Sequence, residues 1–233
     1  MNIKSIAGYL KLTLFVGMLA GFTGAQADLL FTVNLDTTLL INHVAAPFFV
    51  EFQLNDGSGT DHGNNTALLS NFEFGDGSPL GSASLSGGAS GDLGSNIVLA
   101  DENFLNAFIQ EFSAGKTLSF DVALTTMIDF GPQPDQFSFA ILDCSGVEIP
   151  TTGPADALLA VDIDSASPAV RSYGGDVGRS PACGGPPIPL KTPQVVPLPA
   201  SGILFGLGLF GLGAYGMKRM PRSRDSWPHW LSS

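Results

Sequence analysis

Side chains that carry oxygen gather in one glycine-rich run between Asp56 and Asn65, with the sequence DGSGTDHGNN. Oxygen ligands on a loop bent by glycine are what Ca²⁺ requires. An EF-hand would also need a glutamate at the twelfth position, where this chain has Ala67, so that motif is excluded. A solvated hairpin loop is the alternative. The candidate metal ligands are Asp56, Ser58, Thr60 and Asp61.

The second candidate for chemistry is a pair of cysteines, Cys144 and Cys183, which are the only two in the chain. In an oxidising compartment the two thiols can form a disulfide. The loop that it closes holds about 38 residues, for which chain entropy gives roughly 3–4 kcal/mol of stabilisation. We predict the disulfide, with two free thiols as the alternative.

Signatures of enzymes are missing from the sequence. It contains no nucleophile elbow, no zinc-protease HExxH and no phosphate-binding GxxxxGK. Residues 28–192 contain 20 acidic and four basic residues, which gives this part of the chain a net charge of 4 − 20 = −16. With so many carboxylates, some pair falls at glycosidase spacing by chance. Nucleic acid requires the opposite charge. We therefore expect a non-enzymatic protein without a nucleic-acid partner.

The first 27 residues have the pattern of a secretory signal peptide. Lys4 and Lys11 supply positive charge, and an apolar region runs from Leu12 to Ala20. Ala25 and Ala27 form a small-x-small cleavage site, so the mature chain is expected to begin at Asp28. Export explains why the cysteines can pair.

The other end carries an uncharged apolar run over 200–217, long enough for one transmembrane helix. A basic cluster follows it directly. By the positive-inside rule this cluster and the tail over 225–233 stay in the cytoplasm, and the preceding domain lies outside. The basic residues are Lys218, Arg219, Arg222 and Arg224.

The apolar run is preceded by a short motif, and the two together resemble a known sorting signal. The order of motif, glycine-rich helix and basic cluster over 196–224 resembles the PEP-CTERM family in its VPLPA variant. This resemblance implies recognition by an exosortase, a membrane-embedded transpeptidase, and cleavage near the motif. It also implies an association with exopolysaccharide production in biofilm-forming bacteria. The motif residues are Val196, Pro197, Leu198, Pro199 and Ala200.

The region over 28–180 has the alternation of apolar and polar residues that is typical of β-strands. Several strands are expected, and the glycine- and serine-rich stretch over 81–95 is expected to form short strands with glycine turns. Over 101–112 the spacing of the phenylalanines suits a helix or a strand equally. Strands are expected near 29–35, 47–54, 66–74, 96–100, 117–126, 136–142 and 157–163.

In three of these strands the core-facing residues can be named from parity. The first is expected to bury Phe31, Val33 and Leu35, and the second Phe48, Val50, Phe52 and Leu54. In the third, parity places Leu68, Ser70, Phe72 and Phe74 on one face. Short strands with regularly spaced turns indicate an all-β domain, an antiparallel β-sandwich or jelly roll. The proline-rich stretch over 181–195 is expected to be a stiff spacer.

These observations predict an exported protein, anchored in the inner membrane with its domain outside and passed to the cell surface or extracellular matrix after processing. The expected partners are the exosortase, the membrane and an exopolysaccharide. No resident cofactor is expected apart from the candidate Ca²⁺. The alternative function is a carbohydrate-binding β-sandwich assisted by Ca²⁺. Exposed aromatic rings would favour it, but both tryptophans, Trp227 and Trp230, lie in the cytoplasmic tail.

Overall fold

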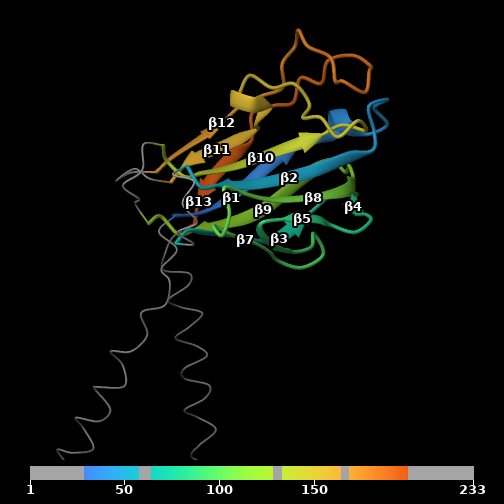
Figure 1. Cartoon of the computed structure of the whole chain (residues 1–233). Helices are drawn as coiled ribbons and strands as arrows, with labels where there is room; N and C mark the ends of the chain where they lie inside the picture. Colours follow the sequence, from blue (N-terminus) through green and yellow to red (C-terminus); the bar gives the residue numbers. More distant parts are fainter. Residues whose placement is uncertain (1–28, 58–63, 128–132, 164–167, 199–233) are drawn as a thin grey trace, which may run out of the picture. The chain divides into compact units, whose positions relative to one another are not determined.

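The protein is described by a computed structural model over residues 29–57, 64–127, 133–163 and 168–198. Within these ranges the regular elements are β-strands, apart from two 3₁₀ turns, η1 (Thr38–Leu40) and η2 (Pro154–Asp156). The strands form two antiparallel sheets that pack face to face (Figure 1). The expected all-β, antiparallel β-sandwich is confirmed.

One sheet has six strands in the order β13-β1-β9-β3-β7-β6. The first and last strands of the domain, β1 and β13, are neighbours in it, with Phe31 opposite Pro197 and Thr32 opposite Val196. The chain therefore enters and leaves the domain at the same place. The strands are β1 (Leu29–Asp36), β3 (Thr66–Glu73), β6 (Gly88–Gly91), β7 (Ile97–Ala100), β9 (Thr117–Leu124) and β13 (Gln194–Pro197).

The other sheet has seven strands in the order β12-β11-β10-β2-β8-β4, and β5 also pairs with β8. In the middle of this sheet β2 lies between β10 and β8 (Figure 1). Because the strands are antiparallel, the end of β2 lies beside the start of β10 and the start of β8. The strands are β2 (Phe48–Asn55), β4 (Ser78–Pro79), β5 (Ser84–Ser86), β8 (Leu105–Ser113), β10 (Gln136–Leu142), β11 (Leu159–Asp162) and β12 (Ala169–Ser172).

Phenylalanines hold the two sheets together. Phe52 and Phe139 of the second sheet meet Phe120 of the first, each with its ring centroid 5.1 Å from that of Phe120 and close to edge-on. Edge-to-face pairs add about 0.5–1.5 kcal/mol beyond the burial of the rings themselves. All three side chains are fully buried, which places the centre of the core at this contact.

The parity predictions hold in β1 and β2, where each residue expected to face the core is buried. In β3 the prediction is wrong. Ala67 and Leu69 are buried and Leu68 is exposed, whereas Phe72 and Phe74 do face the core. A bulge between Ser70 and Glu73 adds one residue and reverses the parity. Asn71 adopts the left-handed conformation there (φ 54°), which asparagine tolerates better than most residues.

The ambiguous stretch over 101–112 contains most of a strand, β8, which pairs with β2 from Leu105 to Phe112. Phe108 and Phe112 face the core, but Phe104 precedes the strand and is 63% exposed. The glycine- and serine-rich stretch over 81–95 forms two short strands, β5 and β6, as expected.

The proline-rich stretch over 181–195, which was expected to be a stiff spacer, is packed on the sandwich. Ile188 and Leu190 are buried, and the N–H of Gly175 donates to the carbonyl of Leu190 at 2.9 Å. The folded unit extends to Pro197, not to residue 180. Because proline lacks an N–H, a proline-containing strand fits an outer edge, and β13 occupies one.

Candidate functional site

A hollow of about 400 Å³ lies at one end of the second sheet. Asn55 ends β2, where Gln136 of β10 is its partner on one side and Leu105 of β8 on the other. Direct partners share a face of the sheet. Leu54 and every second residue before it in β2 face the core. Asn55 and its two partners therefore lie on the outer face of the sheet. Asn55 and Gln136 line the hollow together with Phe104, Gly57 and Gln133.

The turn that presents Phe104 is fixed by hydrogen bonds. The N–H of Asp56 donates to the carbonyl oxygen of Phe104 at 3.1 Å. On either side of Phe104, the buried amide of Asn106 accepts from the N–H of Asn103 and donates to the carbonyl of Asn103, at 3.1 and 2.6 Å. Asn106 also donates to the carbonyl of Leu54 at 3.0 Å, which ties the turn to β2. The exposure of Phe104 is therefore held in place by its neighbours.

Asp135 braces the opposite wall. Its buried carboxylate accepts from the N–H of Gly57 at 2.9 Å and from the Asn65 amide at 2.7 Å. A Cβ at Gly57 would lie 2.2 Å from the carbonyl oxygen of Pro134, so only glycine allows the two segments to approach this closely. In this wall the backbones at Gly57 and Pro134 are in contact, and the Asp135 carboxylate is hydrogen-bonded.

The polar groups at the hollow are partly committed. Gln136 donates through Nε2 to Asp162 at 2.9 Å, and Asp162 is also paired with Arg171 at 2.6 Å. In the part of the chain that the structure describes, Oδ1 of Asn55 has no hydrogen-bond partner, but it is buried and closed to a ligand. Gln133 is exposed where it lines the hollow. Gln133 and Oε1 of Gln136 are therefore the amide groups at the hollow that could bind a ligand.

The predicted metal loop is only partly described. Asp56 is fully buried at the rim of the hollow, while Ser58, Thr60 and Asp61 lie outside the described residues. Across residues 29–57, 64–127, 133–163 and 168–198, no group of three or more His, Cys, Asp or Glu side chains is arranged to hold a metal ion. The Ca²⁺ site remains a prediction from the sequence.

The residues of the predicted sorting signal divide at the end of the fold. Val196 and Pro197 belong to β13 and Leu198 follows it, whereas Pro199, Ala200 and the basic cluster lie outside the described residues. So do Ala25 and Ala27 of the signal peptide. Among the residues that are described, none forms a helix long and apolar enough to cross a membrane.

The predicted disulfide between Cys144 and Cys183 is present. It ties the packed 181–195 stretch to the end of β10. A second tie is the ion pair between Lys191 and Asp36 of β1, at 2.9 Å. Hydrogen bonds from Thr38 and Lys191 lower the pKa of the Asp36 carboxyl to about 2.

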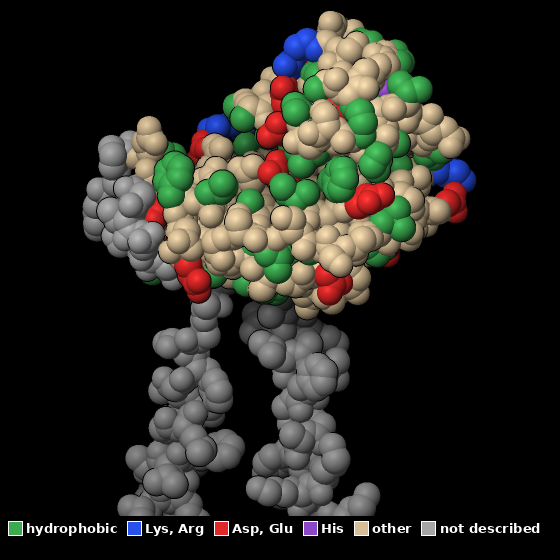
Figure 2. Space-filling view, turned by 45° about the vertical axis from the view of Figure 1, so that its right-hand side comes forward, with side chains coloured by type: hydrophobic (Ala, Val, Ile, Leu, Met, Phe, Trp, Pro, Cys, Tyr) green, Lys and Arg blue, Asp and Glu red, His purple; other side chains and the backbone are tan. Residues whose placement is uncertain are grey.

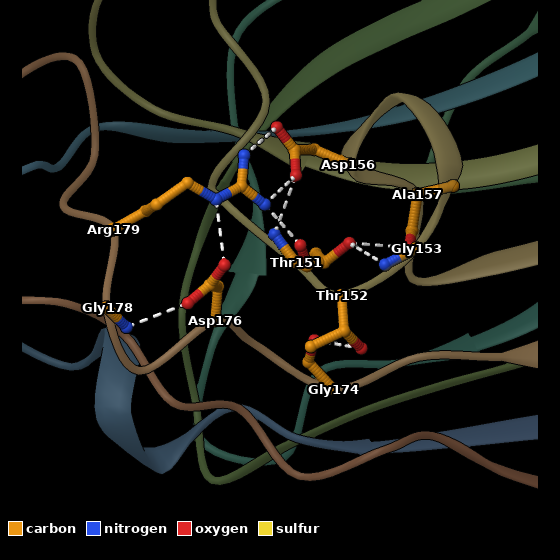
Figure 3. A network of polar contacts seen from close by, with 9 residues as sticks. All are labelled: Thr151, Thr152, Gly153, Asp156, Ala157, Gly174, Asp176, Gly178 and Arg179. Carbon is orange, nitrogen blue, oxygen red and sulfur yellow. Dashed lines mark hydrogen bonds and ion pairs between the residues drawn. The ribbon is translucent and has the colours of Figure 1, made fainter.

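A dense polar network surrounds Arg179 (Figure 3). Its guanidinium donates to both carboxylate oxygens of Asp156, at 3.0 and 2.6 Å, to Asp176 at 2.8 Å and to the carbonyl of Thr151. Asp156 and its neighbour Ala155 both have positive φ, a conformation that costs energy outside glycine. Because every charged group in the network is paired, we assign it to holding two loops together and not to a binding site.

Comparison with known proteins finds no matching family model, curated protein or solved structure. The candidate site therefore rests on the geometry of this chain alone. The sequence indicates that exposed aromatic rings would mark a carbohydrate site, but it does not single out Phe104. The available signal was its place directly before a strand whose other phenylalanines face the core.

Proposed function

We propose that this chain is an exported, non-catalytic protein that a C-terminal sorting signal delivers to the cell surface or extracellular matrix. The observation that carries the proposal is the order of segments after the domain. The VPLPA motif over 196–200 is followed by an 18-residue uncharged run over 200–217 and then by four basic residues within 218–224. An exosortase is the partner that recognises this order, and an exopolysaccharide-rich matrix is the destination.

The end of the fold is compatible with this role. The folded unit stops at Pro197, and Pro197 lies opposite Phe31, close to where the mature chain begins. A processing enzyme that cuts after the motif would leave β13 attached to the domain, because β13 ends at Pro197. In this proposal the run over 200–217 is a transmembrane helix that holds the domain at the inner membrane until cleavage.

Acidic character supports a place outside the cell. Acidic side chains are spread over the face of the domain drawn in Figure 2, with basic ones at its margins. Such a surface keeps an exported protein soluble and repels nucleic acid. This charge alone does not define a ligand.

Intact-mass analysis of the protein recovered from the cell surface tests the proposal. We expect an N-terminus at Asp28 and loss of the residues beyond about position 200. Pro199 lies outside the folded unit. Replacing it with alanine should leave the unprocessed chain in the membrane. Pro189→Ala, at an exposed proline before the motif, is the matched control and should be processed normally. A surface form that still contains Trp230 would contradict delivery by this signal.

A further inference from the structure

The hollow at the end of β2 combines one exposed aromatic ring with a set of amide side chains. Phe104 is the only phenylalanine among the described residues that is exposed. A single exposed apolar side chain needs no explanation by itself. Here, however, Asn106 and Asp56 fix the backbone on both sides of the ring, and Gln133 and Gln136 line the same hollow. We propose that this hollow binds a neutral carbohydrate, with Phe104 as the stacking platform.

The chemistry of a sugar fits these groups. A pyranose ring presents a face of C–H groups that packs on an aromatic ring, and a rim of hydroxyl groups that each donate and accept a hydrogen bond. An amide side chain also offers both functions, so a neighbouring pair of hydroxyls can be bound by one asparagine or glutamine. Gln133 is exposed at the hollow, and Gln136 can use its Oε1 because its Nε2 is committed to Asp162. An apolar surface with a few placed polar groups is the general form of a small-molecule site.

Charge selects the kind of carbohydrate. Asp56 lines the hollow, and Asp162 is the strand partner of Gln136, which also lines it. Arg171 forms an ion pair with Asp162. The domain as a whole carries 20 acidic and four basic residues. An acidic polysaccharide would be repelled by this field. We therefore assign the site to neutral hexose units and not to uronic acids or sulfated sugars.

Size favours a short stretch of sugar over a protein partner. The hollow holds about 400 Å³, within the range of roughly 300–1,000 Å³ seen for small-molecule sites. A stable protein interface needs on the order of 800 Å² of surface on each partner, with an apolar centre. Of the residues that line this hollow, Phe104 alone is a large apolar side chain. One ring surrounded by amides offers too little apolar area for such an interface.

The inference goes beyond delivery to the cell surface and does not depend on it. Binding is measured on the full-length chain in detergent, so a failure of processing does not affect the result. The probes are neutral hexasaccharides of glucose, galactose and mannose, with polygalacturonate as the acidic control. Titration calorimetry, or retardation in gels that contain the polysaccharide, gives the affinity. We expect the native chain to bind at least one neutral probe and not polygalacturonate.

The variants separate stacking from scaffolding. Phe104→Ala should weaken binding at least tenfold, and Phe104→Tyr should preserve it because the ring is kept. Val44→Ala is the matched control, since Val44 is similarly exposed at 69% but precedes the first residue of β2, at the other end from Asn55. Because Phe104 and Val44 are both exposed, neither change should unfold the domain.

Four outcomes would overturn the proposal. They are binding of no probe, binding of polygalacturonate alone, unchanged affinity of Phe104→Ala, and equal loss in the Val44→Ala control. If Phe104→Ala instead abolishes self-association or protein binding while no sugar binds, Phe104 belongs to a protein contact and the carbohydrate assignment is wrong.

Discussion

The backbone N–H of Cys183 donates a hydrogen bond of 2.7 Å to Oδ2 of Asp143, the residue that precedes its disulfide partner Cys144. Asp143 is buried, which alone would raise the pKa of its carboxyl. The hydroxyl and N–H of Ser145, together with the N–H groups of Cys183 and Val147, donate to it and hold that pKa below its usual range. A covalent bond and a charge-assisted hydrogen bond thus join the same two segments.

Removing the disulfide tests how far it stabilises the fold. The double substitution Cys144→Ser and Cys183→Ser should lower the free energy of unfolding by about 3–4 kcal/mol, because the unfolded chain loses a closed loop. Urea unfolding measures the difference. A reducing agent should destabilise the native protein by a similar amount and leave the double variant unchanged. Equal stability of the two proteins would mean that the Asp143 bond holds the segments without covalent help.

A second prediction concerns the loops held by Arg179. Replacing Arg179 with lysine keeps the charge but removes the fork that reaches both oxygens of Asp156. The amides of Thr151 and Gly178 donate to Asp156 and Asp176, at 2.9 and 2.7 Å. We expect both amides to exchange hydrogen about tenfold faster in the variant, since local opening becomes easier.

The control for this exchange experiment is Arg171→Lys. Arg171 pairs with Asp162 on β11, a carboxylate that is not one of the two bound by Arg179. The control should leave the exchange of both amides unchanged. If it accelerates them as much as Arg179→Lys does, the loops respond to general destabilisation and the network has no specific effect.

The strands were largely predictable because local alternation decides them. In β2 each second residue from Phe48 to Leu54 is buried, as parity requires. Parity failed in β3, since the extra residue near Asn71 leaves no mark in the apolar pattern. A bulge is fixed by pairing with a distant strand, here through the hydrogen bond from Asn71 to Asp121 at 2.7 Å.

Composition misled where long-range contacts decide the structure. Prolines over 181–195 suggested a spacer, yet Ile188 and Leu190 in the same stretch are buried. The hollow beside Phe104 has the same origin, because Asn55, Gln136 and Leu105 become neighbours only when three strands pair. Spacing along the chain carries no information about such a row.

A third prediction follows from Glu51, which lies on the outer face of β2 and is only 8% exposed. Burial raises the pKa of its carboxyl, a hydrogen bond with Gln53 opposes the rise, and the negative charge of Glu148 adds to it. A raised carboxyl pKa means that the folded state binds the proton more tightly than the unfolded state. Its contribution to stability is therefore full below pH 4.5, the ordinary value, and is lost as pH rises through the folded pKa.

The substitution Glu51→Gln removes this dependence. We expect the variant to be more stable than the native protein near pH 8 and close to it below pH 4.5. Thermal unfolding across this pH range measures the difference. Glu111→Gln is a control on the neighbouring strand β8. A stability gain of Glu51→Gln that does not change with pH would show that packing, and not the carboxyl charge, is responsible.

The last prediction concerns where the domain ends. A chain that stops at Leu198 keeps β13 paired with β1, whereas one that stops at Thr192 loses it. Without β13, the residues of β1 from Phe31 to Asn34 present unpaired backbone groups at a sheet edge. The half-buried Val195 is lost as well. We expect the shorter chain to be less stable by about 1–3 kcal/mol and to associate with other copies as its concentration rises, because a bare edge pairs readily with another strand.

Urea unfolding and sedimentation at several concentrations measure both effects. Val196→Ala in the longer chain, at a side chain that is 50% exposed, should change neither. Equal stability of the two truncated chains would place the boundary before β13; a loss confined to the shorter chain makes β13 part of the domain that a cut after the sorting motif leaves whole.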